Sequence, residues 1–236
     1  MRYTDLADEL YHAPEDALPA GVRVATAKRG GVTVTRVEIA REGLERPRGR
    51  YVTLEVPRVS LLDERDESVI EPAAAELRAL LPAAGPVLVL GVGNRRVTAD
   101  ALGPRTVQKI FVTMGQRSVP VQGIRPVAAV APGVSASTGL SLQQLAAALV
   151  RQVRPAALLC VDSLCSSEPE RLGRTLQFSD TGLFPALMQS EEGRDLVVTP
   201  RELDSVIAHG AALLAAAINR ALQPRLSIAQ LGWLTN

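Results

Sequence analysis

The chain has 236 residues, 47% of them hydrophobic and 22% charged, so it can bury the core of one domain or of two small ones. This composition excludes fibrous, disordered and disulfide-scaffold proteins. With 26 basic and 25 acidic residues the net charge is +1, so no overall field predicts binding to nucleic acid or to an anionic membrane. The longest wholly apolar stretch of the C-terminal third, 211–218, is too short to span a bilayer. The acidic start also lacks the apolar run of a signal peptide, so we expect a cytoplasmic protein.

The cysteines and histidines predict neither a metal site nor a nucleophilic triad. Cys160 and Cys165 flank one short segment, and the sequence has no second cysteine pair or histidine cluster to complete a zinc site. We interpret both as free, buried thiols of a reducing compartment. His12 and His209 are the only histidines, and neither lies in a Gly-rich or nucleophile-like context. No metal and no cofactor is predicted.

The N-terminal part, residues 21–60, is predicted to be β-rich. Apolar residues largely alternate with polar ones from Gly21 to Val56, and Gly30 and Gly31 mark a turn. The segment 41–50 combines glycine, proline and four arginines, which is typical of an exposed connection. From 71 to 81 the apolar spacing becomes helical.

From residue 86 onward, strands and helices alternate. The apolar run 86–91 is typical of a strand buried on both faces of a parallel sheet. Further elements are predicted in order: helix 103–114, strand 126–131, helix 145–153 after a Ser141/Gln144 capping box, strand 156–162 and helix 199–222. The sequence therefore predicts an α/β fold with a mainly parallel central sheet flanked by helices, its core spanning 86–222.

Two carboxylates follow the predicted parallel strands. Asp100 comes after the first strand and Asp162 ends the third. Ligands and catalytic groups gather at the carboxyl ends of such strands, so neighbouring strands would place both side chains in one crevice. There one carboxyl can hold a proton while the other takes one from water, as amide hydrolysis requires. From spacing alone, structural roles stay open, with Asp162 capping a turn and Asp100 a helix.

Local charge and glycine spacing add two weaker signals. Between 95 and 125 six basic residues accompany Asp100 alone, whereas nine acids and four arginines lie between 162 and 204. This asymmetry favours Asp100 as the base and Asp162 as the proton holder. The pair Gly91 and Gly93 also suggests a dinucleotide fingerprint, but Arg96 stands at the third glycine position. A tight turn explains both glycines equally well.

The segment 91–104, GVGNRRVTADALGP, resembles the signature of the germination protease family of spore-forming bacteria. Further segments resemble that family in the same order: TDLA at 4–7, YVTLEV at 51–56, RP at 125–126, APGV at 131–134, TG at 138–139, the strand ending at 162, SDTG at 179–182 and VTP at 198–200. The ordered set covers most of the chain.

The resemblance implies an endopeptidase that degrades small acid-soluble spore proteins during germination, in the forespore or spore core. It implies a fold akin to hydrogenase maturation proteases, a homotetramer and an atypical aspartic-type mechanism whose two aspartates fall on Asp100 and Asp162. The residues expected to line the site are Gly91, Gly93, Asn94, Pro132, Gly133, Thr138 and Asp180.

The resemblance also implies a zymogen that processes itself. The bond cut would be Asp5–Leu6, because TDLA resembles the acidic–aliphatic–Ala site of the substrate proteins. Residues 1–5 would then be a propeptide and 6–236 a single protease domain. The alternative is a frayed terminus whose sequence happens to match.

Between Pro185 and Val197 the chain is shorter than the family pattern, which carries a Gly-rich loop and a further strand there. The shortening keeps a second function open: a relative that binds spore proteins, or a metal through Asp100 and Asp162, without cleaving. With no histidine near either aspartate, such a metal site would be all-oxygen.

Overall fold

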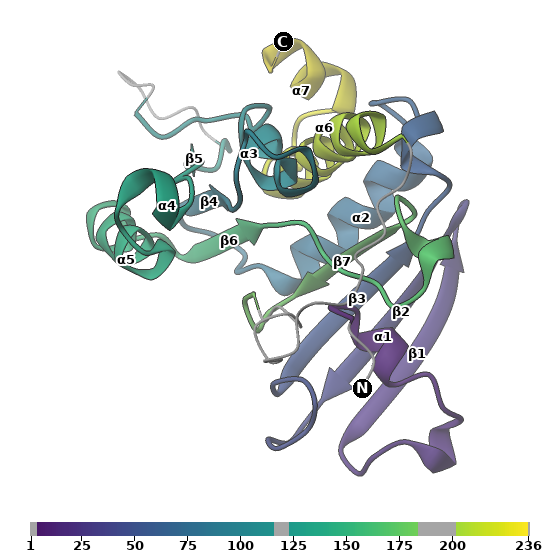
Figure 1. The fold of residues 1–236 in the computed structure, drawn as a ribbon. Coiled ribbons are helices and arrows are strands. Elements are labelled where there is room, and N and C mark those ends of the chain that lie inside the picture. Colours follow the sequence, from purple (N-terminus) through teal and green to yellow (C-terminus); the bar gives the residue numbers. More distant parts are fainter. Residues whose placement is uncertain (1–3, 116–122, 184–201, 236) are drawn as a thin grey trace. The chain divides into compact units, whose positions relative to one another are not determined.

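A computed structural model describes residues 4–115, 123–183 and 202–235 (Figure 1). The chain forms two compact units, the first made of 1–61 and 164–201 and the second of 62–163 and 202–236. One unit contains an antiparallel sheet and the other a parallel sheet with helices. The predicted α/β class is therefore confirmed.

The first unit is built on a four-stranded antiparallel sheet. Its strands are β1 (Val22–Arg29), β2 (Val32–Ile39), β3 (Gly49–Glu55) and β7 (Thr175–Ser179), in the order β1-β2-β3-β7. The first three confirm the predicted β-rich part, whereas β7 was not predicted. Helix α1 (Ala7–Leu10) and three single-turn helices, η1 (Glu15–Ala17), η2 (Val59–Leu61) and η4 (Pro169–Arg171), complete the described part of this unit.

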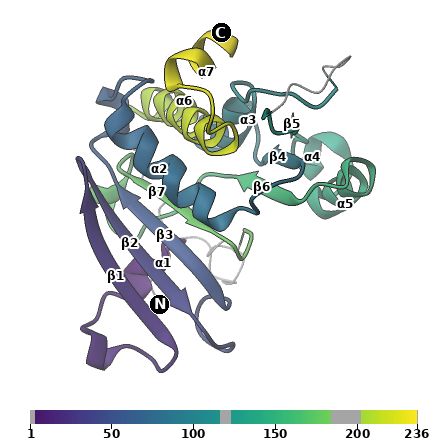
Figure 2. The ribbon, with the colours of Figure 1, turned by 180° about the vertical axis from the view of Figure 1, so that it is seen from behind.

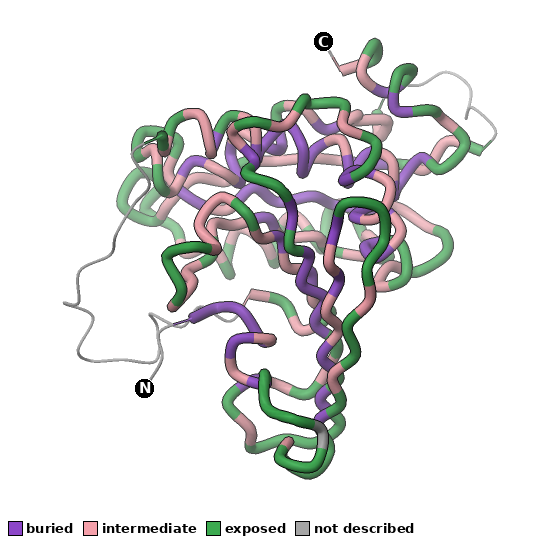
Figure 3. The backbone as a smooth tube through the Cα atoms, turned by 90° about the vertical axis from the view of Figure 1, so that its right-hand side faces the viewer, coloured by how far each residue is buried: buried purple, intermediate pink, exposed green. Residues whose placement is uncertain are grey.

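The core of the first unit follows the two-residue period of its strands. In β2 and β3 the pairs Val34–Leu54 and Val37–Tyr51 face each other across the ladder and are buried. Ala7 of α1 packs on this core, and Figure 3 shows the segment after the N-terminal trace as buried. Residues 6 and 7 are thus part of the folded unit.

The second unit is built on a three-stranded parallel sheet. Its strands are β4 (Val87–Gly91), β5 (Val127–Val130) and β6 (Ala157–Val161), in the order β5-β4-β6. All five residues of β4 are buried, as the unbroken apolar run predicts for a central parallel strand. The helices are α2 (Glu67–Leu80), η3 (Thr98–Asp100), α3 (Leu102–Val107), α4 (Ser135–Thr138), α5 (Leu142–Val153), α6 (Leu203–Leu222) and α7 (Ile228–Leu234).

Helices α2 and α6 lie side by side in this unit (Figure 2). Twelve of the twenty residues of α6 are buried. The helix is long and apolar enough to cross a membrane, with a mean hydropathy of 1.4 over a window that is 67% buried. A buried core helix meets the same criterion, so the finding is weak support for a membrane span.

Two helix boundaries differ from those predicted. Helix α2 begins at Glu67, because the Asp66 side chain accepts a hydrogen bond from the backbone N–H of Ser68 and caps it. The predicted helix 103–114 is wrong in its second half, since α3 ends at Val107. The predicted capping box of α5 is confirmed. The start signal at 199–201 lies outside the described residues, and α6 is described from Leu203.

Candidate active site

The carboxyl end of β4 is where the connections of the parallel sheet diverge. From β4 the chain crosses through α3 to β5 on one side, and then through α5 to β6 on the other. Such a switch point is where open α/β sheets place their ligand sites. The hydrogen bond from Val92 N to Val161 O, 2.8 Å, extends the β4–β6 ladder one residue beyond Gly91. Asp162 therefore follows β6 directly beside the loop that leaves β4.

Two glycines bring the start of α3 onto this end of the sheet. A Cβ on Gly91 would lie 2.3 Å from the carbonyl oxygen of Gly103, and a Cβ on Gly103 would lie 2.3 Å from the carbonyl oxygen of Val161. Neither position admits a side chain. Gly91, one of the residues expected to line the site, therefore acts by letting three backbone segments meet. Gly103 was not singled out from the sequence, since a lone glycine at a helix start has several explanations.

The carboxylate of Asp100 turns back toward the loop that follows β4. It ends η3, and its Oδ2 accepts a hydrogen bond from the backbone N–H of Asn94 at 2.7 Å. Gly93 lies under it with φ +119°, and a Cβ there would come within 2.7 Å of Asp100 Oδ1. The residue at the N-cap of α3 is Ala101, without a side-chain cap. The helix-cap interpretation of Asp100 is therefore wrong, and the structure brings Gly93, Asn94 and Asp100 together.

Asp162 is joined to the segment of Asp100 through Ser163. The backbone N–H of Ser163 donates to Asp162 Oδ1 at 2.8 Å, as the turn-capping interpretation predicts. The Ser163 hydroxyl then donates to the carbonyl oxygen of Ala99 at 2.9 Å. One residue thus contacts Asp162 and the neighbour of Asp100. Sequence reasoning missed Ser163, because only the paired register of β4 and β6 makes it a bridge.

The pKa of the Cys160 thiol, near the end of β6, is affected by the neighbouring charge of Asp162. Burial raises its pKa above the usual value near 9, and the nearby carboxylate of Asp162 raises it further. Cys160 and Cys165 are both free and half-buried. At neutral pH Cys160 is therefore a protonated thiol rather than a nucleophile.

A third carboxylate belongs to the same neighbourhood. The Thr98 hydroxyl donates to Oδ1 of Asp204, in the first turn of α6, at 3.1 Å. This contact ties α6 to η3 and so to the segment of Asp100. Asp204 was missed because more than one hundred residues separate it from Thr98 in sequence.

The loop after β5 lies at the same edge of the sheet. Gly133, with φ +79°, would bring a Cβ within 3.3 Å of Thr138 Cγ2, and the Thr138 hydroxyl donates to the carbonyl oxygen of Val134, just before α4, at 3.2 Å. Pro132 precedes this turn. Since β5 pairs with β4 in parallel, the expected lining residues Pro132, Gly133 and Thr138 lie at the carboxyl end of a strand next to Gly91.

Asp180, also expected to line the site, lies in the first unit and is held by Arg50. The backbone N–H and the Nε of Arg50 donate to its two carboxylate oxygens, each at 2.8 Å. Burial raises the pKa of Asp180, but these Arg50 donors outweigh it and hold the pKa below its usual value. Asp180 therefore fixes the end of β7 to β3.

The expected processing residues, Asp5 and Leu6, are buried in the first unit, at 7% and 2% exposure. The backbone of Asp5 pairs with Cys165, and its carboxylate accepts from Cys165 N at 2.6 Å. The interpretation of this segment as a terminus with a chance match predicts an exposed, unattached chain, which the structure does not show for residues 4–7.

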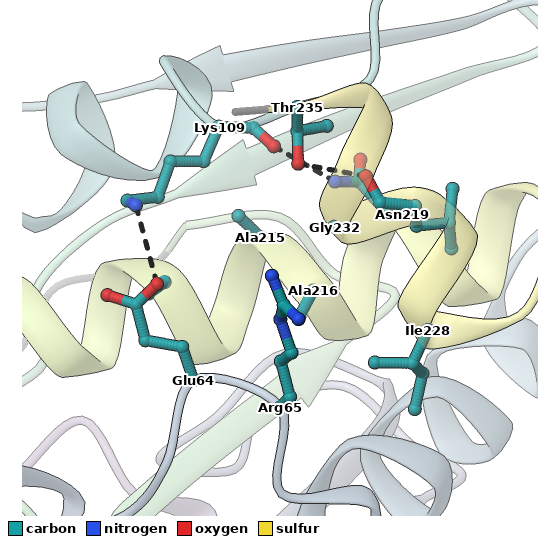
Figure 4. Close-up of a pocket in the computed structure, with 11 residues that line it drawn as sticks. Glu64, Arg65, Lys109, Ala215, Ala216, Asn219, Ile228, Gly232 and Thr235 are labelled. Carbon is teal, nitrogen blue, oxygen red and sulfur yellow. Dashed lines mark hydrogen bonds and ion pairs between the residues drawn. The ribbon is translucent and has the colours of Figure 1, made fainter.

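Within the described residues, no group of three or more His, Cys, Asp or Glu side chains is arranged to hold a metal ion. A small cavity of about 60 Å³ lies elsewhere in the second unit, between α6 and α7 (Figure 4). Lys109 forms an ion pair with Glu64 at its rim. None of the expected site residues lines this cavity.

Comparison with known proteins gives consistent matches. The sequence profile of the family described as "Germination protease" matches residues 6–190. A germination protease of Clostridium acetobutylicum is 34% identical over 199 residues, which are 77% of this chain and 61% of that protein. One from Clostridium perfringens strain 13 is 39% identical over 166 residues (65% and 51%), and one from Bacillus velezensis is 35% identical over 201 residues (77% and 55%). The chain spans about half to three fifths of the length of these curated relatives.

Proposed function

The chain belongs to the germination protease family, and from this premise we propose that it is an endopeptidase that cleaves small acid-soluble spore proteins, with Asp100 and Asp162 activating the attacking water. The observation that carries the proposal is the pairing of β4 with β6, because it sets the two carboxylate-bearing segments side by side at the switch point of the sheet.

The local charge of the sequence supports different tasks for the two aspartates. Six basic residues accompany Asp100 between 95 and 125, whereas nine acids and four arginines lie between 162 and 204, and this asymmetry favours Asp100 as the base and Asp162 as the proton holder. In this scheme Asp100 takes a proton from water, the resulting hydroxide attacks the scissile carbonyl, and Asp162 gives its proton to the leaving amine. No metal takes part in the scheme.

The site of this reaction comprises further residues with supporting tasks. Gly91, Gly93 and Asn94 shape the loop that holds Asp100, while Pro132, Gly133 and Thr138 border the same sheet edge. Ser163 and Asp204 are added to this set as positioning residues.

The remaining features of the proposal follow from the family. The enzyme is made as a zymogen, loses residues 1–5 by cutting Asp5–Leu6, and works as the domain 6–236 in a homotetramer in the spore core. Its parallel unit corresponds to the hydrogenase maturation protease fold. A relative that binds spore proteins without cutting them is the second candidate, favoured by the segment between Pro185 and Val197, which is shorter than the family pattern.

One experiment separates the two candidates. The full chain and the chain lacking residues 1–5 are each incubated with a purified small acid-soluble spore protein, and products are read by mass spectrometry. The proposed endopeptidase is supported if the spore protein is cut after an acidic residue once the chain has been shortened. Intact substrate that nevertheless co-elutes with the chain in gel filtration supports the binder.

A further inference from the structure

Asn94, in the loop that follows β4, is held in place by three hydrogen bonds. Its backbone N–H donates to Asp100 Oδ2 at 2.7 Å, and its carbonyl oxygen accepts from the backbone N–H of Val97 at 3.0 Å. Its side-chain Oδ1 accepts from the backbone N–H of Arg96 at 3.0 Å. These contacts use both backbone groups and one of the two polar atoms of the side chain, so the fold of the loop fixes the position of Asn94.

The other polar atom of this side chain, Nδ2, is left over as a donor. Because a backbone N–H needs an acceptor, the bond from Arg96 identifies Oδ1 as the oxygen and Nδ2 as the nitrogen. Among the described residues no group accepts a hydrogen bond from Nδ2, and Asn94 is only half-buried, so a bound molecule can reach it. The amide N–H groups therefore belong to the residue whose backbone contacts the proposed base, and they have no structural task in the described part of the chain.

Gly93 adds a second donor beside Asn94. Gly93 is buried, and within the ranges that the structure describes its backbone N–H donates to no acceptor. Buried N–H groups without a partner are rare in folded proteins, because nothing replaces the hydrogen bond to water that they lose. A Cβ on Gly93 would lie 2.7 Å from Asp100 Oδ1, so this donor too is next to the Asp100 carboxylate.

The proposed reaction needs donors of this kind, because negative charge develops on the scissile carbonyl oxygen. When water attacks, its oxygen bonds to the carbonyl carbon, its proton passes to Asp100, and the π electron pair of the C=O bond moves onto the carbonyl oxygen. When the intermediate collapses, that pair re-forms the C=O bond, the C–N bond breaks, and the leaving nitrogen takes the proton of Asp162. Donors already held near the oxygen lower the barrier, since they need not reorganise during the reaction.

We propose that Asn94 is a third catalytic residue, whose Nδ2 donates to the carbonyl oxygen of the scissile bond as charge develops there, with the Gly93 N–H as second donor. The inference rests on the proposed function, because it names the groups that stabilise the intermediate of that reaction. The next two residues, Arg95 and Arg96, are exposed and basic, and their charge favours an anionic intermediate. A role in the loop alone accounts for Oδ1 but not for the amide, because aspartate or serine makes the same turn.

The test compares two peptides that cannot be cleaved. One carries a phosphinate group in place of the scissile amide of a spore-protein site, and the other carries an ethylene group, which has no oxygen. Only the phosphinate presents the charged oxygen of the intermediate to the two donors. Binding is measured by isothermal titration calorimetry for the full chain and for the 6–236 chain, and the Asn94 variants are made in the form that binds the phosphinate more tightly.

Asn94→Ala should weaken phosphinate binding at least about tenfold and change binding of the ethylene peptide by less than about twofold. Asn94→Ser is the matched control for the turn, because its hydroxyl still accepts from Arg96 N but is too short to donate where Nδ2 does. It should behave like Asn94→Ala. In cleavage of a small acid-soluble spore protein, both variants should lose about 100- to 1,000-fold in kcat with KM nearly unchanged.

Several results would overturn the proposal. These are equal phosphinate affinity in wild type and Asn94→Ala, wild-type affinity in Asn94→Ser, and phosphinate binding by neither form of the chain. A wild-type chain that binds the two peptides equally overturns it without any variant, so the outcome is decided even if neither variant folds by circular dichroism. A chain that cleaves the spore protein while its phosphinate binding ignores Asn94 overturns only the role of Asn94. One whose phosphinate binding depends on Asn94 but that does not cleave overturns only the proposed reaction.

Discussion

A Cβ on Gly93 would lie 2.1 Å from the carbonyl oxygen of Asp100, so only glycine fits where the chain folds back over that aspartate. The same turn, at φ +119°, places the N–H of Asn94 against the Asp100 carboxylate. The proposed base is thus positioned by backbone alone, through a residue with no side chain.

Replacement of Gly93 by alanine should therefore damage activity more than stability. The added methyl group must push the Asp100 backbone away, and small displacements of a catalytic group cost on the order of 100-fold in rate. The free energy of unfolding should fall by about 1–3 kcal/mol. Gly139→Ala is the matched control: it also has positive φ but no atom within 4 Å of its Cβ, so kcat should persist. Equal kcat in wild type and Gly93→Ala would show that Asp100 needs no such positioning.

Ser163→Ala should lower kcat and leave KM nearly unchanged. The substitution removes the hydroxyl that donates to Ala99 O at 2.9 Å and so loosens the link between the two aspartate segments. Loss of one hydrogen bond costs about 1 kcal/mol of stability. Thr235→Val, which removes a 3.0 Å hydroxyl–carbonyl bond at the end of α7, controls for that loss. If Ser163→Ala has the same kcat and KM as Thr235→Val, Ser163 is not part of the site.

Alkylation of Cys160 should report the charge of Asp162. Burial and the Asp162 carboxylate both raise the pKa of this thiol, so in Asp162→Asn the thiolate should form at lower pH. Iodoacetamide labelling followed across pH by peptide mass spectrometry should show the Cys160 curve shifted to lower pH in the variant. Cys165, in the first unit, serves as internal reference. An unshifted Cys160 curve contradicts the placement of the carboxylate beside the thiol.

The parts of the fold that rest on local pattern were predictable. The apolar run 86–91 indicates a central parallel strand wherever its neighbours lie, and the Ser141/Gln144 box marks a helix start by itself. Helix α3 shows the limit. Its predicted second half is replaced by a turn because buried Asn219 of α6 donates to the carbonyl of Lys109 and accepts from the N–H of Phe111. The apolar pattern near residue 110 does not indicate a hydrogen-bond partner that lies more than one hundred residues away in sequence.

Some residues of the candidate site could likewise be predicted from the sequence, and others could not. Asp100 and Asp162 could be found because strand ends are visible in sequence and parallel strands share an edge. Ser163 and Asp204 could not, since their roles depend on the β4–β6 register and on where α6 packs. Strand β7 was missed because its pairing with β3 joins residues about 120 apart, and five alternating residues are a weak signal.

The N-terminal segment should loosen in acid through Glu9. Burial raises the pKa of Glu9, but hydrogen bonds from Ser166 and Ser167 outweigh it and hold the pKa below the usual value near 4.5. A pKa that is lower in the folded state contributes stability above pH 4.5, and that contribution is lost as the pH falls through the folded value. Urea unfolding from about pH 7 to about pH 3 should show wild type losing its stability advantage over Glu9→Gln. Glu170→Gln, at an exposed position, should follow wild type throughout.

The most direct test of the Asp100–Asp162 account is cleavage of a small acid-soluble spore protein by the 6–236 chain and by its Asp100→Asn and Asp162→Asn variants. Each substitution keeps the side-chain shape and removes the proton-transfer function, so each should lower kcat by about 10²–10⁴-fold while the melting temperature stays within a few degrees of wild type. Because the two groups act in one reaction, the double variant should be little worse than either single one. Cleavage by the parent chain that persists undiminished in either folded Asn variant would contradict the account.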